Sequence, residues 1–244
     1  MFSFFKTKPA LKDLIPQGYI DIHSHILFGI DDGAKTIQDS NFLMESLLEF
    51  GFSKCITTPH TIEYVWDNSR EDILEKEKEL KTLSPKLTSS LKLTAASEYM
   101  MSDGFIKLFK NEPLLTLKDK FVLVEMSYIN PPIQLYEILF ELQLAGYKPI
   151  LAHPERYLYL HHNFSEYEKL KSAGCYFQLN LLSTVGYYGK EVYTIAEKLL
   201  KKGMIDFTGS DVHHQNHIEA FSQKVKLKDV APLVQAMKNN SKFQ

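Results

Sequence analysis

The chain has 244 residues, of which 44% are hydrophobic and 24% are charged, and this length predicts one globular domain with a sizeable core, with two small domains as the alternative. Its 28 lysines and arginines nearly balance its 30 aspartates and glutamates, so a net charge of −2 provides no overall basic field for nucleic acid or an anionic membrane. Two cysteines, Cys55 and Cys175, are too few for a disulfide framework, which favours a reducing, cytoplasmic setting.

The first 17 residues, MFSFFKTKPALKDLIPQ, form a phenylalanine-rich lead that precedes the first strand pattern. They lack the long apolar run of a signal peptide or of a membrane-spanning helix. We expect residues 1–17 to be an arm that packs on a single domain of residues 18–244. A weak surface anchor and a dimer contact are the alternatives for this arm.

Short β-prone runs alternate with helical patterns along the rest of the chain, which is typical of parallel strands joined by crossover helices. Seven strands are expected, near residues 19–22, 55–58, 91–95, 121–124, 149–151, 176–179 and 206–208. Helices are expected over residues 36–51, 69–83, 134–144, 165–173 and 192–202, and a closing helix with a frayed end over 229–244. Ser69 and Asp72 have the spacing of a capping box for the second helix. This alternation favours a closed α/β barrel over an open sheet.

Ionisable side chains follow six of the seven predicted strands. In chain order they are His23 with His25, His60, Glu98, Glu125, His153, and Asp211 with His213. Because the C-terminal ends of the strands of a parallel barrel open on one face, we expect these groups to converge at one mouth. Imidazoles and carboxylates without thiolates suit Zn, Mn or Fe ions, and so many ligands predict more than one ion.

The motif HSH lets His23 and His25 face the same ion while Ser24 points away. A lone histidine at a strand end is more commonly structural, and a carboxylate there is commonly a helix N-cap. Because such residues follow six of the seven predicted strands, metal ligands are favoured over these structural roles. The other histidines are expected at the surface, namely His161, His162, His214 and His217.

Arg156, three residues after His153 in AHPERY, can bind two phosphate oxygens with its planar guanidinium. Divalent ions beside such an arginine suit the hydrolysis of a phosphate ester. The alternative for Arg156 is a pair with Glu155 or with a helix end. Neither cysteine fits the C-x5-R motif of cysteine phosphatases, since Thr61 and Leu181 stand at the arginine position, so a thiolate nucleophile is not expected.

The strings DIHSHILFGIDDGAK, TTPH, ASEY, VLVEM, LAHPER and TGSDVHH resemble, in order and spacing, the PHP (polymerase and histidinol phosphatase) family. More closely, the chain resembles the bacterial PHP-type protein tyrosine phosphatases of capsule and exopolysaccharide systems, over about residues 18–221. The resemblance implies a distorted, TIM-like (β/α)7 barrel. It also implies three divalent ions, Mn first and Fe or Zn as alternatives. The implied reaction is hydrolysis of phosphotyrosine on a tyrosine autokinase tail by a metal-activated hydroxide.

The matching motifs also imply site residues. His23, His25, Glu98 and Asp211 would hold one ion, Glu98, Glu125 and His153 a second, and Asp32, His60 and His213 the third. Arg156 corresponds to the phosphate-binding arginine, and His60 or a water would supply a proton if one is needed. Asp31 is expected to accept a hydrogen bond from a ligand histidine.

Three departures from the family pattern are Thr61, Ala96 and the stretch MSYIN after Glu125, and the first and third leave the choice of substrate open. One rival function is a small-molecule phosphatase of the histidinol phosphate kind. Another is a non-catalytic module that binds a phosphorylated tail. A nuclease ranks last because the sequence has no basic stripe, and we expect no nucleic acid partner and no stable membrane insertion. A homo-oligomer is compatible with the sequence.

Overall fold

The computed structural model describes residues 8–244 of the chain. In chain order its strands are β1 (Tyr19–Asp21), β2 (Phe52–Thr57), β3 (His60–Thr61), β4 (Thr94–Ala95), β5 (Glu98–Met100), β6 (Phe121–Glu125), β7 (Lys148–Ala152), β8 (Tyr176–Asn180) and β9 (Phe207–Gly209). They form two parallel sheets, in the orders β1-β2-β4 and β3-β5-β6-β7-β8-β9. The seven predicted strands are therefore present, while the short strands β3 and β5 were not predicted.

Backbone hydrogen bonds join the two sheets into one distorted barrel. On one side, Ala96 N donates to Thr57 O at 2.8 Å and Glu98 N donates to Pro59 O at 3.1 Å, so the ladder continues where the chain bends. On the other side, Asp211 N donates to His23 O at 2.7 Å, which connects the end of β9 to the end of β1. The predicted closed barrel is thus confirmed over the open sheet.

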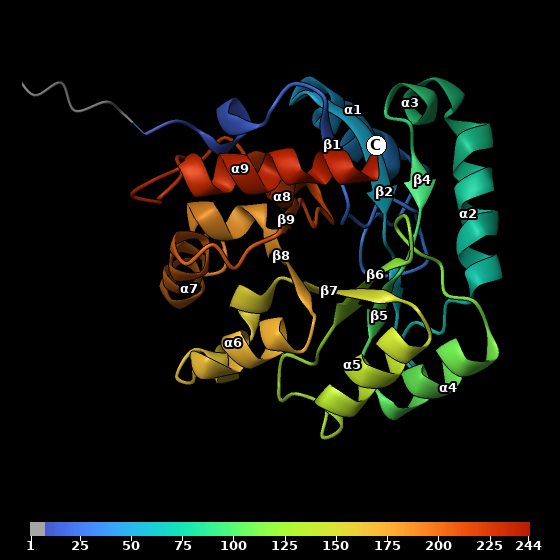
Figure 1. Ribbon diagram of the computed structural model, residues 1–244. Helices are drawn as coiled ribbons and strands as arrows, with labels where there is room; N and C mark the ends of the chain where they lie inside the picture. The colour runs from blue at the N-terminus through green and yellow to red at the C-terminus, as the bar shows by residue number, and fades with distance from the viewer. Residues whose placement is uncertain (1–7) are drawn as a thin grey trace, which may run out of the picture.

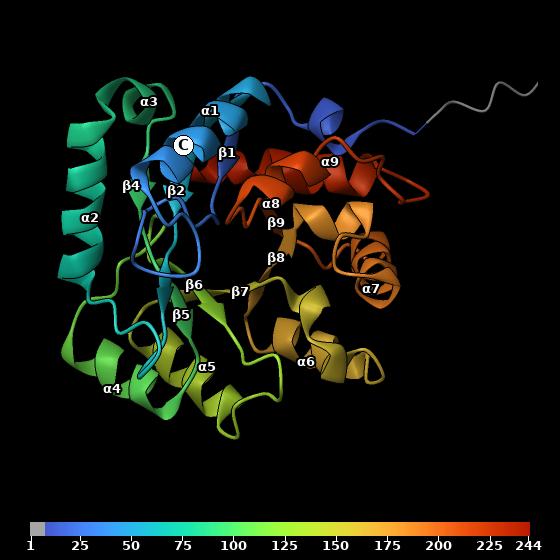
Figure 2. The same cartoon turned by 180° about the vertical axis from the view of Figure 1, so that it is seen from behind.

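Helices lie around the outside of the strands (Figure 1, Figure 2). They are α1 (Ile37–Glu49), α2 (Arg70–Leu83), α3 (Pro85–Ser90), α4 (Asp103–Asn111), α5 (Leu135–Leu144), α6 (Ser165–Ser172), α7 (Lys190–Lys201), α8 (Gln215–Ala220) and α9 (Ala231–Asn239). The six predicted helices are confirmed, and α3, α4 and α8 are additional. At the start of α2, Ser69 Oγ accepts from Asp72 N at 3.1 Å and Asp72 Oδ2 accepts from Ser69 N at 2.9 Å, so the predicted capping box is confirmed.

The apolar core has two layers because successive side chains of a strand point to opposite faces. Phe121 and Leu123 of β6 belong to a small cluster made mainly of strand residues, which we place inside the barrel. Val122 and Val124 of the same strand join the larger cluster, which includes the helical residue Leu139. Glu125 has the parity of Phe121 and Leu123, so it points inward at the C-terminal end of the barrel.

The C-terminal segment closes the opposite end of the barrel. Asn240 Nδ2 donates to Ile20 O at 2.8 Å and to Thr208 O at 2.7 Å, while the Phe243 ring is buried against Phe121. The frayed end expected for this segment is therefore wrong, because its last turn is fixed by buried polar and aromatic contacts. Within residues 8–244, no helix has both the length and the apolar character needed to cross a bilayer.

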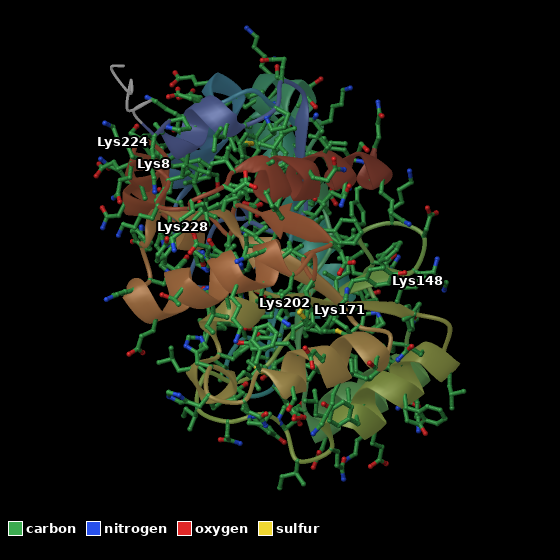
Figure 3. All side chains as sticks on the ribbon, turned by 60° about the vertical axis from the view of Figure 1, so that its left-hand side comes forward. Lys8, Lys148, Lys171, Lys202, Lys224 and Lys228 are labelled. Carbon is green, nitrogen blue, oxygen red and sulfur yellow. The ribbon has the colours of Figure 1, made fainter. Side chains whose placement is uncertain are left out.

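The described part of the predicted arm, residues 8–17, lies against the C-terminal half of the chain. Leu11 is fully buried in the larger cluster, and its backbone N donates to Gln223 O at 3.0 Å. Figure 3 shows Lys8 beside Lys224, where the two segments run antiparallel. Residues 1–7 of the arm lie outside the described residues, and the division into arm and domain stays a prediction.

We expect Leu11→Ala to lower the free energy of unfolding by about 2–4 kcal/mol, because the truncated side chain leaves a cavity in the core. Urea denaturation measures this change, with the exposed neighbouring substitution Lys12→Ala as the control. A loss below about 0.5 kcal/mol, the size of an ordinary surface change, would contradict a packing role for the arm.

Candidate metal centre

The nine residues expected to hold metal converge at the C-terminal end of the barrel. They are His23, His25, Asp32, His60, Glu98, Glu125, His153, Asp211 and His213. Most of them are buried, whereas His213 is half-buried and Asp32 is exposed. The geometry therefore brings together side chains that are up to 190 positions apart in the sequence.

Glu98, at the start of β5, lies at the centre of this cluster and contacts four of its histidines. Its Oε2 lies 3.1 Å from His23 Nε2, 3.2 Å from His60 Nδ1 and 3.5 Å from His25 Nε2. Its Oε1 lies 3.2 Å from His153 Nε2. One buried carboxylate thus faces imidazoles that follow three different strands.

Ligand atoms within 4.8 Å of one another form four overlapping groups. These are His25-Asp32-His60-His213, His23-Glu98-His153, His23-His25-Asp211 and His60-Glu98-Glu125. Together the four groups contain all nine expected ligands. His25 appears both with His23 and Asp211, as expected, and in the group of Asp32, His60 and His213. The allocation of ligands to individual ions stays a prediction.

Several buried polar atoms in the cluster fit a bound cation. His60 Nδ1, Glu98 Oε1 and Glu125 Oε1 have no hydrogen-bond partner among the described residues, although the first and last lie 2.8 Å apart. Leaving such atoms unpaired is costly, so groups of this kind call for a ligand. Burial and the neighbouring carboxylate Glu98 raise the pKa of Glu125 to about 7, and a bound cation would offset the repulsion between these two acids.

Two of the histidines expected to bind metal are oriented by hydrogen bonds on the sides of their rings that face away from the cluster. His25 Nδ1 lies 2.7 Å from Asp31 Oδ2, which confirms the expected acceptor and leaves Nε2 facing the cluster. His23 Nδ1 lies 2.8 Å from Oε1 of Gln178 on β8. Gln178 was not identified from the sequence, although it alternates with Tyr176 and Asn180 on one face of its strand.

Tight backbone turns hold the site. Gly33 N donates to Asp31 Oδ1 at 2.9 Å, and a Cβ at Gly33 would lie 2.3 Å from His25 O, so only glycine fits here. His153 and Asp211 both adopt the left-handed region, with φ of 36° and 51°. Such conformations are unfavourable for residues with a side chain, and both of these residues are among those expected to hold metal.

Arg156 projects into the same site. Its Nη1 donates to Asp211 Oδ2 at 2.8 Å, and its guanidinium lies between two rings, 4.9 Å from the centre of Tyr128 and 4.1 Å from that of Tyr188. Among the described residues, Arg156 does not form the alternative ion pair with Glu155. Glu155 Oε1 instead accepts from Asn180 N at 2.9 Å.

A pocket of about 210 Å³ opens onto these groups. Its lining residues are Asp32, His60, Tyr128, His153, Arg156, Tyr188, Asp211, His213, His214 and His217. His217 was expected at the surface, and that prediction is wrong: the side chain is buried and its Nδ1 accepts from His213 N at 3.1 Å. Helix α8 causes this, because it begins just after His214 and turns His217 back toward the pocket. His161 is half-buried, whereas His162 and His214 are exposed.

Trp66 is another site residue that the sequence did not reveal. Its ring stacks on His60 with centroids 5.0 Å apart and planes 13° apart. The loop that carries Trp66 therefore packs directly on an expected ligand.

The chain is similar to several known proteins. The model of the family described as capsular polysaccharide synthesis, CpsB/CapC, matches residues 19–237. The tyrosine-protein phosphatase YwqE of Bacillus subtilis (strain 168) is 30% identical over 196 residues, which are 80% of this chain and 77% of that protein. The putative tyrosine-protein phosphatase CapC of Staphylococcus aureus is 29% identical over 195 residues, 80% of this chain and 76% of that protein.

Solved structures show the same fold. One match, from work on YwqE of Bacillus subtilis and CpsB of Streptococcus pneumoniae as metal-dependent tyrosine phosphatases, has a TM-score of 0.76 at 29% identity and covers 83% of this chain and 84% of that one. A histidinol phosphate phosphatase of Lactococcus lactis, complexed with zinc, L-histidinol and phosphate, has a TM-score of 0.51 at 14% identity and covers 93% and 94%. This second likeness concerns the fold alone.

Proposed function

The chain belongs to the capsular polysaccharide synthesis family CpsB/CapC, and on that premise we propose that it is a metal-dependent protein tyrosine phosphatase. The observation that carries this proposal is the cluster of nine acidic and imidazole groups, five of which line one pocket together with Arg156. The proposed substrate is a phosphotyrosine protein of the capsule system, specifically the tail of a tyrosine autokinase in the cytoplasm. The proposed cofactor is three divalent ions per chain, with manganese preferred over iron or zinc.

Bound divalent ions would neutralise phosphate oxygens and lower the pKa of a water so that it attacks phosphorus. The described cluster would hold them through Glu98, Glu125 and the surrounding imidazoles. Burial, together with nearby Arg156, lowers the pKa of His153 to about 4, so its ring is neutral, which is the form that binds metal.

Arg156 would bind the nonbridging phosphate oxygens. Its two aromatic neighbours, Tyr128 and Tyr188, hold the guanidinium in place and would flank the phenyl ring of the substrate. Because a phenol has a pKa near 10, tyrosine leaves more readily than an aliphatic alcohol and has less need of a general acid. Both nitrogens of His60 face carboxylates, Glu125 at 2.8 Å and Asp32 at 3.4 Å, which supports a ligand role more than proton donation.

Chelation tests the function directly. We expect protein loaded with manganese to hydrolyse p-nitrophenyl phosphate and a phosphotyrosine peptide, and EDTA to abolish both activities. Elemental analysis before and after chelation would count the ions on each chain. If loaded protein binds the phosphopeptide but releases no phosphate, the non-catalytic module is the better reading.

The same assay distinguishes a protein tyrosine phosphatase from a small-molecule phosphatase of the histidinol phosphate kind. A protein tyrosine phosphatase should have a higher kcat/KM for the phosphotyrosine peptide than for histidinol phosphate. Comparable or faster turnover of histidinol phosphate would overturn the proposed substrate class while leaving the metal centre intact.

A further inference from the structure

Five large apolar side chains stand exposed on short segments that also carry residues lining or contacting the pocket. These residues, called the apolar rim below, are Tyr64, Val65, Ile129, Ile133 and Leu158, with exposed fractions of 87%, 62%, 86%, 102% and 51%. Single exposed apolar residues are ordinary, but a group of them around one opening marks an interaction surface. The pocket inside the rim is lined mainly by histidine, aspartate and arginine.

The first part of the rim is the tip of a tight turn. Ile62 N donates to Trp66 O at 2.9 Å and Trp66 N donates to Ile62 O at 2.9 Å, so the intervening residues Tyr64 and Val65 project from a closed loop. The Trp66 ring stacks on His60, which ties this loop to the metal cluster. Tyr64 has a φ of 66°, an unfavourable conformation that the hydrogen-bonded turn maintains.

The second part of the rim lies on the two segments that carry Tyr128 and Arg156. Ile129 and Ile133 belong to the loop between β6 and α5, whose Tyr128 lines the pocket. Leu158 comes two residues after Arg156, and the next residue, Tyr159, donates its hydroxyl to Ser127 O at 3.0 Å. This bond links the two loops, so the rim keeps a fixed position relative to the pocket.

The size of the pocket indicates what covers the rim. About 210 Å³ is less than the roughly 300–1,000 Å³ of pockets that enclose a whole small ligand. It suits a phosphorylated side chain, while the rest of the substrate stays outside, against the loops. A polypeptide carries side chains on both sides of its phosphotyrosine, whereas a small phosphate ester has nothing to place there.

We propose that the apolar rim docks aliphatic or aromatic side chains that flank the phosphotyrosine of a protein substrate. This inference rests on the proposed function, because it assigns the rim to the substrate of the same pocket. The stretch MSYIN after Glu125 supplies Ile129 and also carries Tyr128, so one segment contributes to both the apolar rim and the pocket.

The test uses manganese-loaded protein and three probes. Two phosphotyrosine peptides are identical except that leucines flank the phosphotyrosine in one and serines in the other, and the third probe is p-nitrophenyl phosphate. We expect the wild type to have a kcat/KM about tenfold higher for the leucine peptide, since partial burial of apolar side chains has this effect on affinity.

The rim variant Ile129→Ser/Ile133→Ser should lose that preference through a higher KM for the leucine peptide. Its kcat for p-nitrophenyl phosphate and its metal content should stay at the wild-type values. The matched control is Leu83→Ser/Leu144→Ser, which removes two exposed leucines at the far ends of α2 and α5. Leu83 lies about 20 Å along α2 from the loop that carries Tyr64. The control should keep the full preference.

Three results would overturn the docking inference. The first is equal turnover of the two peptides by the wild type, which leaves the phosphatase function standing but removes the role of the rim. The second is a wild-type dimer, in sedimentation analysis, that the rim variant converts to monomer, because the rim would then contact a second copy of the chain. The third is no hydrolysis of either peptide, which overturns the proposed function as well.

Discussion

Replacing Glu98 by glutamine is expected to lower kcat/KM for phosphotyrosine substrates by about a thousandfold and to reduce the metal bound per chain. The change keeps the shape of the side chain but removes the buried negative charge. Glu98 is the residue most sensitive to this loss because its two oxygens face His23, His60 and His153 at 3.1–3.2 Å. The amide group would also turn an N–H toward imidazole nitrogens that need to stay available to a cation.

The control for this prediction is Glu77→Gln, another carboxylate with little exposure, which pairs with Lys81 on α2 away from the pocket. Steady-state kinetics and elemental analysis on both variants separate a metal effect from a general loss of structure. Wild-type activity and full metal content in Glu98→Gln would mean that Glu98 is not a ligand.

The convergence of the site was predictable from the sequence for a simple geometric reason. Each strand of a parallel barrel ends on the same face, so a polar residue after each strand is placed without knowledge of the packing. His23, Glu98, His153 and Asp211 were identified in this way, and the structure brings them into one cluster. The positions of these residues at strand ends, more than any single motif, predicted that they would lie close together.

Residues placed by loops or by tertiary contacts could not be found in the same way. Trp66 and His217 reach the site because a turn and the short helix α8 fold back toward it, and neither feature has a periodic pattern. The strands β3 and β5 were missed because only two residues separate each of them from the strand before it, β2 and β4, so neither has a strand pattern of its own. Helix α4, in contrast, had a usable signal: Ser102 caps it, and Phe105 and Phe109, four residues apart, form its buried face.

The surroundings of Arg156 also lay beyond the sequence, and they matter for its role. The sequence offered Glu155 as a neighbour, but that carboxylate turns into the core, where Ser183 Oγ donates to it at 2.7 Å. Burial raises the pKa of Glu155 to about 7, so it is a poor counter-ion for the arginine near neutral pH. The guanidinium is left to face Asp211 and the pocket, where an anionic substrate can reach it.

Arg156→Ala is accordingly expected to lower kcat/KM for phosphotyrosine substrates by about 10²–10³-fold, the usual cost of losing one group that stabilises transition-state charge. Metal content should stay at the wild-type value, because arginine is not a ligand and the buried carboxylates remain. Arg156→Lys should recover only part of the loss, since an ammonium group cannot bind two phosphate oxygens in one plane or stack between Tyr128 and Tyr188.

The matched control is Arg70→Ala, which removes the only other arginine of the chain, on α2. It should leave the kinetics unchanged. A parallel loss of metal in Arg156→Ala would show that the arginine acts by holding Asp211, to which it donates at 2.8 Å, and not by binding phosphate. Full kcat/KM in Arg156→Ala would rule out both roles, because within residues 8–244 no lysine or other arginine lines the pocket to replace it.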